Sequence, residues 1–399
     1  MRTFKDNMMK RLISFLLLAP LAAFVPGRLE AYELNLGTNL PPVDFHGFVS
    51  QGFLYSSAYN YLGDTSKGSF KFTEAGLNAS FNPLPRTRIA AQAFTYDVGE
   101  AGHYDVILDY ALAEYTFNDH FGVRTGRIRR PQGLYNDIQD VDVARTFVLL
   151  PQGMYDARWR DFYVSLDGGE FFGTIPLKQA GSLSYEIYAG VVRPSNDGGV
   201  ALEIRGALPA FISLDSIGSA AIFGGQAWWN TPVNGLRFGA AGGFLPAVDF
   251  TTTIQTPGGP IHPDNQTSVA FQQFSAEYLW KAWTFQAESF FRNVYPDAAG
   301  MPDTHSLTWY GSAAYRFNKW FEAGGYYTEY YGDTTHPDNS LLYQKDAALT
   351  LRFDPRDWWT FKVEAHYIRG TGLLQDNPDN PSQNDNGWWM FAVKTTFNF

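Results

Sequence analysis

The sequence of 399 residues contains no cysteine and only seven histidines. The lack of cysteine excludes a disulfide framework, a thiolate nucleophile and a cysteine-based metal site. The histidines are scattered along the chain, and none lies in a recognisable nucleophile motif. The sequence also has no EF-hand spacing and no cluster of metal-ligand residues. It therefore predicts a protein that is not an enzyme and that holds no metal or cofactor.

Charge is also sparse, and positive charge is the sparser kind. Charged residues make up 18 % of the chain, against about 25 % in an average protein. After residue 31 only eight lysines remain, and this part carries 25 basic and 38 acidic residues, a formal charge of −13. Because a protein that binds nucleic acid needs a basic face for the phosphates, nucleic acid is excluded as a partner.

Long apolar runs are missing except near the N-terminus. Residues 12–25 are apolar, Lys5, Lys10 and Arg11 precede them, and small residues lead to Ala31. This pattern predicts a secretory signal peptide over residues 1–31, with a membrane anchor as the alternative. No later segment approaches the ~20 apolar residues of a spanning helix. If the exported chain crosses a membrane, it must therefore do so with strands.

Aromatic residues and glycine are abundant. Aromatic residues make up 17 % of the chain, Tyr and Trp supply 34 of the 67, and there are 38 glycines. Tyr and Trp favour the boundary between lipid and water, because the ring is apolar and its tip is polar. Glycine suits tight turns and strongly curved strands.

Apolar and polar residues alternate along many segments, as in a strand with one apolar and one polar face. In residues 360–369 one face holds Phe361, Val363, Ala365 and Tyr367, and the other holds Lys362, Glu364 and His366. A charged side chain facing the lipid midplane costs roughly 2–4 kcal/mol, so the polar face must meet water. Residues 104–117 and 269–279 do not keep this alternation along their whole length, and we expect a β-bulge or a tilt in each.

We predict sixteen strands: 44–55, 69–82, 87–96, 104–117, 121–129, 161–166, 182–192, 220–230, 236–250, 269–279, 283–294, 305–317, 321–331, 346–353, 360–369 and 387–399. Long connections lie at about 56–68, 130–160, 193–219, 251–268, 295–304, 332–345 and 370–386, and most of them alternate with short turns. Short turns on one side and long loops on the other indicate an all-β, antiparallel, up-and-down transmembrane β-barrel. A soluble sandwich or propeller is the alternative.

The C-terminal strand carries a family resemblance. Trp389, Phe391, Val393, Phe397 and Phe399 share one face, and the chain ends on an aromatic residue. This resembles the last strand of bacterial outer-membrane β-barrels. The resemblance implies short periplasmic turns, long extracellular loops and a water-filled lumen. It also implies that Phe399, Phe397 and Val393 form the signal read by the barrel-insertion machinery.

The connection at about 130–160 is the longest and the richest in mixed charge. It begins in the run Gly126-Arg127-Ile128-Arg129-Arg130-Pro131-Gln132-Gly133-Leu134-Tyr135. This run resembles a segment of porin-like proteins in the phosphate-selective porin superfamily. Sixteen-stranded porins fold the long loop after their fifth strand into the pore, and the resemblance implies the same for residues 130–160.

Charged side chains around such a throat are the candidate site, because a narrow aqueous pore in a low-dielectric wall concentrates their field. The candidates for lining the constriction are Asp137, Asp140, Asp142, Arg145, Arg158 and Arg160 of the loop and Arg124, Glu288, Arg292, Arg316, Arg352, Lys362, Glu364 and Lys394 of the wall. Structural ion pairs and loop charges exposed to solvent are the alternatives for these residues. Arg127 and Arg129 lie an even number of residues from Val123 and therefore share its face of the strand. This favours a position for both arginines above the lipid band.

We therefore expect residues 32–43 to form a short periplasmic segment and residues 44–399 a single barrel domain. The expected function is a porin that passes ions and small hydrophilic solutes, general or mildly cation-favouring, because no ladder of basic residues is present. A channel specific for anions, phosphate or hydrophobic compounds is the alternative; a barrel hydrolase and a non-conducting adhesin or structural barrel are less favoured. Expected partners are outer-membrane lipid, lipopolysaccharide and, by resemblance, two further copies in a homotrimer.

Overall fold

The computed structural model describes residues 32–34, 41–297, 302–374, 379–380 and 387–399, so the expected signal peptide over residues 1–31 lies outside the described residues. Sixteen long strands form the barrel: β2 (Val43–Ser56), β3 (Phe72–Phe81), β4 (Thr87–Val98), β5 (Ile107–Asn118), β6 (Phe121–Arg129), β7 (Ser165–Pro176), β8 (Ser182–Val192), β10 (Ala220–Asn230), β11 (Leu236–Thr256), β13 (Asp264–Trp280), β14 (Trp283–Pro296), β15 (Thr304–Asn318), β16 (Phe321–Tyr331), β17 (Tyr343–Arg356), β18 (Trp359–Gly370) and β19 (Trp388–Asn398).

Short elements complete the described part of the chain. They are the strands β1 (Tyr32–Leu34), β9 (Ile212–Ile217) and β12 (Gly259–Ile261), the helices α2 (Arg160–Tyr163) and α3 (Gly199–Ala207), and the 3₁₀ turns η1 (Thr65–Lys67), η2 (Asn136–Ile138), η3 (Asp142–Ala144) and η4 (Lys178–Ala180). No helix in the described ranges is long and apolar enough to cross a membrane.

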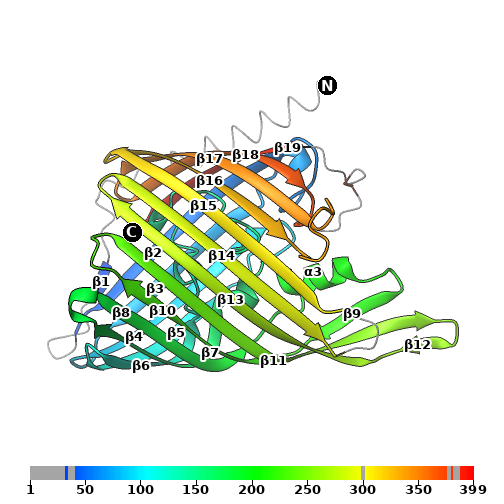
Figure 1. Cartoon of the computed structure of the whole chain (residues 1–399), viewed down its shortest axis with the longest axis horizontal. Helices are drawn as coiled ribbons and strands as arrows, with labels where there is room; N and C mark the ends of the chain where they lie inside the picture. Colours follow the sequence, from blue (N-terminus) through cyan, green and yellow to red (C-terminus); the bar gives the residue numbers. More distant parts are fainter. Residues whose placement is uncertain (1–31, 35–40, 298–301, 375–378, 381–386) are drawn as a thin grey trace.

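The barrel is closed, and every long strand pairs antiparallel with its neighbours (Figure 1). The last strand, β19, pairs with the first, β2, where Phe397 lies opposite Val49. The terminal residue extends this seam, because the Phe399 N–H donates to the Gly47 carbonyl and the Gly47 N–H donates to the Phe399 carbonyl. A Cβ on Gly47 would lie 2.5 Å from the tip of the Phe399 ring, so a larger residue at this position would displace the ring. Closure leaves no unpaired sheet edge in contact with lipid.

The predicted all-β, sixteen-stranded, antiparallel barrel is confirmed, but the sixth predicted strand, 161–166, is wrong. These residues form α2 and the first two residues of β7, which continues to Pro176. The strand was hidden because glycine replaces side chains along it. A Cβ on Gly168 would lie 2.1 Å from the Ala189 carbonyl oxygen, so this close approach requires glycine.

The two expected phase breaks have different outcomes. In β5 a register shift between Gln92 and Ala93 of the paired strand leaves Asp109 as a bulged residue, as predicted. In β13 no bulge lies within residues 269–279, because the strand pairs with β14 without interruption and alternates regularly there; a register shift with β11 lies just before it, between Thr267 and Val269. Its inward face simply begins with the apolar residues Val269 and Phe271, which pack inside the barrel.

The outer wall is apolar and carries rings at the end where the short turns lie. Phe317 of β15, Phe321 of β16 and Phe353 of β17 stack in sequence, with ring centroids 5.1 and 5.2 Å apart. Trp358, Trp359 and Phe397 continue the row at the barrel seam. Amphipathic and aromatic rings in such a row match the boundary between acyl chains and water.

The two ends of the barrel differ in their connections. The strand pairs β5–β6, β13–β14, β15–β16 and β17–β18 are joined by two-residue turns, whereas β6–β7 and β8–β10 are joined by long connections at the opposite end. At that end β11 and β13 extend beyond their neighbours, with β12, β9 and α3 beside them (Figure 1). The half of the lumen at the end with the two-residue turns is hereafter the turn-side half, and the half at the end with the long connections is the loop-side half.

Candidate functional site

The connection between β6 and β7, residues 130–164, lies inside the barrel and is hereafter the inward segment. Its backbone and side chains bond to inward-facing residues of walls on several sides, including β4, β14, β17 and β18. Four groups of polar contacts attach it, each built around a buried carboxylate.

The first group is centred on Glu288 of β14, which is 4 % exposed. Its carboxylate accepts the Leu134 N–H at 3.0 Å and the Tyr155 hydroxyl at 2.6 Å, both from the inward segment. From the wall it accepts the Tyr310 hydroxyl at 2.9 Å and the Ser275 hydroxyl at 2.6 Å. The donors surround the charge, which is what a buried carboxylate requires.

The second group places Asp142 of the inward segment against two lysines of the wall. The Asp142 carboxylate lies 3.1 Å from Lys362 Nζ and 3.5 Å from Lys394 Nζ, and it accepts the Thr396 hydroxyl at 2.8 Å. Burial alone would raise the pKa of Asp142, but Lys362, Lys394 and Arg145 hold this pKa well below its usual range. The carboxyl group therefore stays ionised and fixes η3 to β18 and β19.

The third group holds the tip of the inward segment. The Glu364 carboxylate accepts the backbone N–H groups of Val148 and Leu149, both at 2.8 Å. Its orientation is fixed by His366 Nε2 at 3.0 Å. Nearby, Arg352 donates to the carbonyls of Arg145 at 3.1 Å and Val143 at 2.9 Å. Wall side chains thus satisfy backbone groups of a segment that lacks a regular hydrogen-bond ladder.

The fourth group joins the base of the inward segment to β4 and β5. Arg129 bonds to both oxygens of Asp140 and to Asp109, the bulged residue of β5, and Arg160 bonds to Asp109 at 2.8 Å. The expectation that Arg129 lies above the lipid band is therefore wrong, because its guanidinium turns to these buried carboxylates. Arg127 does pair outside this group, with Asp167 at 3.0 Å.

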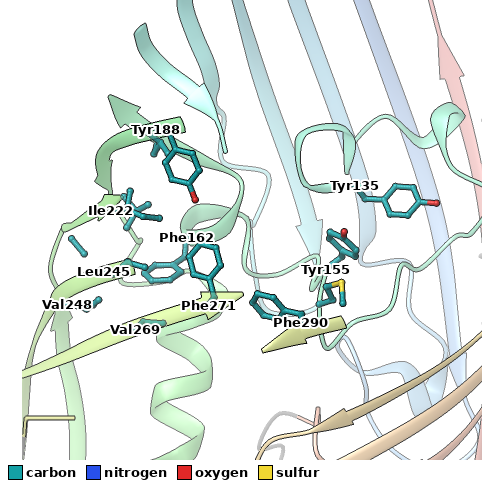
Figure 2. Close-up of a cluster of buried hydrophobic side chains, with 14 of the residues drawn as sticks. Tyr135, Tyr155, Phe162, Tyr188, Ile222, Leu245, Val248, Val269, Phe271 and Phe290 are labelled. Carbon is teal, nitrogen blue, oxygen red and sulfur yellow. The ribbon is translucent and has the colours of Figure 1, made fainter. Parts of the chain in front are cut away.

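Apolar packing reinforces these attachments. Phe162 of the inward segment belongs to one buried cluster with the wall residues Phe271 and Phe290 (Figure 2). Leu134 and Leu150 of the inward segment belong to the same cluster. A second cluster joins Val148 and Leu149 to Tyr59, Tyr61 and Leu62 of the β2–β3 connection and to Trp388 of β19. The loop-side half is consequently filled by side chains over much of its cross-section.

The turn-side half keeps polar side chains in contact with solvent. Arg124 pairs with Glu114 and Glu170, both at 2.9 Å, and Glu186 lies on the neighbouring strand opposite Phe172. Across the lumen, Arg316 lies 2.8 Å from Glu322 and 2.6 Å from Asp354. The Arg124, Arg237 and Arg316 side chains are 22 %, 38 % and 32 % exposed, so their charges act on the aqueous space.

Two cavities border the inward segment. One, with a cavity volume of about 20 Å³, lies toward β14 and β16 and is lined by Trp159, Tyr163, Phe290, Arg292 and Tyr330 among others. The other, of about 10 Å³, lies toward β3, where Phe72 and Glu74 line it. The inward segment therefore leaves limited space on two sides.

The fourteen candidate residues fall into two groups in the structure. The larger group is buried in the attachments of the inward segment: Asp140, Asp142, Arg145, Arg158, Arg160, Glu288, Arg352, Lys362, Glu364 and Lys394. The smaller group keeps some exposure: Asp137, Arg124, Arg292 and Arg316. These charged side chains are buried because the inward segment folds against them. Each one that contacts the segment exchanges its hydrating water for a bonding partner in the protein.

Several participants were not singled out from the sequence. Asp109 was missed because only the bulge turns it inward, and Trp159 and Tyr163 because a loop has no fixed periodicity. Glu74, by contrast, sits at an inward position between Phe72 and Gly76, so the alternation of β3 contained the signal.

Comparison with known proteins gives the fold but no close relative. No family model matches the sequence, and no curated protein matches it. Solved structures do match, and the first is Vibrio cholerae OmpT, with a TM-score of 0.57 and 12 % identity over 93 % of this chain and 100 % of that one. An anion-selective porin from Comamonas acidovorans matches with a TM-score of 0.55 and 10 % identity over 90 % of this chain and 99 % of that one. Salmonella typhi OmpF in complex with daunomycin matches with a TM-score of 0.55 and 12 % identity over 92 % of this chain and 100 % of that one. The chain thus has the closed sixteen-stranded barrel fold of Gram-negative outer-membrane porins.

Proposed function

We propose that this protein is a channel of the bacterial outer membrane through which ions and small hydrophilic solutes diffuse passively. The observation that carries the proposal is the inward segment, attached by buried carboxylates to the wall of a closed barrel whose turn-side half is polar. A rigid constriction of this kind selects solutes by size and charge. A barrel that served only as an anchor has no need of so many buried charges at mid-lumen, each of which costs desolvation.

The membrane location rests on the outer wall. Exposed apolar side chains cover it, including Leu77, Phe171 and Leu349, each more than half exposed, and such a surface is stable in lipid. The expected signal peptide, outer-membrane lipid and lipopolysaccharide as surroundings, and insertion guided by Phe399, Phe397 and Val393 belong to the same proposal. A homotrimer is proposed from the porin fold; one matched OmpT structure is described as a trimer form.

A mild preference for cations follows from the turn-side charges. On the β4–β8 wall two arginines, Arg88 and Arg124, lie among the carboxylates of Glu114, Glu170 and Glu186, with Arg88 opposite Glu114 in the paired strand. On the opposite wall Arg316 and Arg352 balance Glu322 and Asp354. The excess of negative charge on one wall attracts cations into the lumen. The fold alone does not determine ion selectivity, since one protein with the same fold is described as anion-selective.

The test is electrical. We expect purified protein in a planar lipid bilayer to give stepwise conductance in KCl, and a reversal potential under a salt gradient that favours K⁺ slightly. Absence of steps at any protein concentration would refute the channel, whereas steps with a strong preference for Cl⁻ would refute only the cation preference. Heat-denatured protein at the same detergent concentration serves as the control.

A further inference from the structure

The short turns at one end of the barrel are basic, although the chain as a whole has a formal charge of −10. The turns lie at residues 82–86, 119–120, 177–181, 231–235, 281–282, 319–320 and 356–358. They carry five exposed basic residues, hereafter the turn-side cations: Arg86, Lys178, Lys281, Lys319 and Arg356. The same turns contain two acidic residues, Asp119 and Asp357. This end of the barrel therefore has the opposite sign of charge from the chain.

The turn-side cations are not ion-paired. Among the residues that the structure describes, no carboxylate oxygen lies within 4.0 Å of any of them. Exposed lysines at the other end of the barrel differ in this respect, because Lys71 lies 3.1 Å from Glu100 and Lys345 lies 3.6 Å from Glu329. No carboxylate of the described chain thus balances the charges at the turns, and they are available to a partner outside the chain.

The local backbone does not favour a basic residue at three of these positions. Arg86, Lys178 and Lys281 have φ angles of 66°, 56° and 55°. This left-handed conformation is unfavourable for most residues with a Cβ, and Gly and Asn adopt it more readily. The basic side chains at these positions therefore indicate a use for the charge rather than a requirement of the turn.

Two of the turn-side cations adjoin exposed tryptophans. Lys281 Nζ lies 5.0 Å from the centroid of the Trp280 ring, and this tryptophan is 46 % exposed. Trp320, which follows Lys319, is 54 % exposed. Exposed tryptophans on a barrel favour the boundary between acyl chains and water. Because a two-residue turn cannot project far from the wall, these cations lie at the level of lipid headgroups.

The turn-side cations are spread around the whole barrel. Their turns follow β3, β7, β13, β15 and β17, and in the closed strand order β3 and β13 lie on opposite walls. A protein partner covers one continuous patch of a surface, whereas lipid surrounds a barrel on all sides. The distribution therefore favours lipid as the partner.

We propose that the turn-side cations bind the headgroups of anionic phospholipids in the membrane leaflet that meets the short turns. The phosphate oxygens accept N–H bonds from the ammonium and guanidinium groups, and the negative charge of the leaflet attracts each cation. The contact fixes the level at which this end of the barrel lies in the membrane. The proposal rests on the membrane location proposed above and adds a lipid class to it.

The test is the binding of phosphatidylglycerol to the purified protein in detergent, measured by native mass spectrometry, with phosphatidylcholine of the same acyl chains as the neutral probe. We expect phosphatidylglycerol to bind about fivefold more tightly at low ionic strength, and high salt to reduce this preference. A variant that combines Lys178→Gln, Lys281→Gln and Lys319→Gln should lose most of the preference. Three Lys→Arg changes at the same positions should retain it.

The matched control combines Lys67→Gln, Lys71→Gln and Lys345→Gln. It removes the same number of lysines from the other end of the barrel, where each is ion-paired, and should leave the lipid preference unchanged. Equal preference for phosphatidylglycerol in the wild type and the turn variant overturns the inference.

Two further outcomes separate this inference from its neighbours. If the turn variant loses retention on isolated peptidoglycan but keeps its lipid preference, the cations serve the peptidoglycan carboxylates, and the lipid assignment is overturned. If the wild type shows the predicted preference but never conducts in a bilayer, the proposed channel is overturned and the lipid contact stands.

Discussion

Charged side chains that meet the inward segment are almost completely buried, as in the pair of Lys362 (0 % exposed) and Asp142 (1 %), whereas wall charges away from the segment leave Arg237 38 % and Arg316 32 % exposed. The residue types are the same in both groups. Breaking a buried pair leaves an uncompensated charge in a low dielectric, which is strongly destabilising. An exposed pair contributes little to stability, but its field reaches the solute. Charge therefore builds the constriction where it meets the inward segment and acts on passing ions where it remains exposed.

The largest effect is expected from Asp142→Ala, which removes the counter-ion shared by Lys362 and Lys394. Both ammonium groups are 0 % exposed, so the loss is expected to be about 3–5 kcal/mol. Thermal unfolding in detergent, followed by circular dichroism, measures it. Glu277→Ala, which breaks a partly exposed pair, is the control and should cost less than about 1 kcal/mol. Equal costs for the two variants would remove the distinction between the buried and the exposed charges.

The next effect is expected from Glu364→Ala, which leaves the N–H groups of Val148 and Leu149 without an acceptor. Unsatisfied buried donors cost about 1–3 kcal/mol each, so the tip of the inward segment should detach. Single-channel conductance should rise, and a protease should cut within residues 130–164. Glu114→Ala changes a wall carboxylate that bonds to Arg124 in the turn-side half, and should leave proteolysis unchanged.

A smaller effect is expected from Glu186→Gln on the acidic β5–β8 wall. Removal of one negative charge from the turn-side half should move the reversal potential toward anions by a few millivolts, with no change in proteolysis of the inward segment. Asp338→Asn, in an exposed loop, removes the same charge outside the lumen and should have no effect. A shift of the same size in both variants would assign selectivity to the protein's overall charge.

The smallest effect concerns pH and Asp161 of α2. Burial raises the pKa of Asp161 to about 6, although the Ser195 N–H, 2.7 Å from the carboxylate, opposes the rise. A carboxyl group with a raised pKa favours the folded form when it is neutral, so this contribution is lost as pH rises from about 4 to about 6. Protection from hydrogen exchange around residues 158–163 and 193–199 should be greater at pH 5 than at pH 7. Asp161→Asn should abolish this difference.

The alternation of side chains and the spacing of turns predicted most of the barrel. Residues 360–369 show why: Lys362, Glu364 and His366 cannot face lipid, so parity alone assigns them to the lumen. The same reasoning failed for β7, where Gly168, Gly169 and Gly173 carry no side chain to alternate. Alternation also could not predict which inward-facing charges contact the inward segment. The parity of a residue gives the face to which its side chain points but not the residue that it contacts.

The amino-acid sequence by itself determined the fold class, the number of barrel strands and the face on which most wall charges lie, with Asp109 and Arg129 as exceptions, because a strand in lipid must separate apolar from ionisable side chains every second residue. Only the tertiary structure decided that Asp142, Glu288 and Glu364 hold the inward segment and that Arg292 faces a cavity. The inward segment has no periodicity, and its path is fixed by partners more than a hundred residues away in the chain.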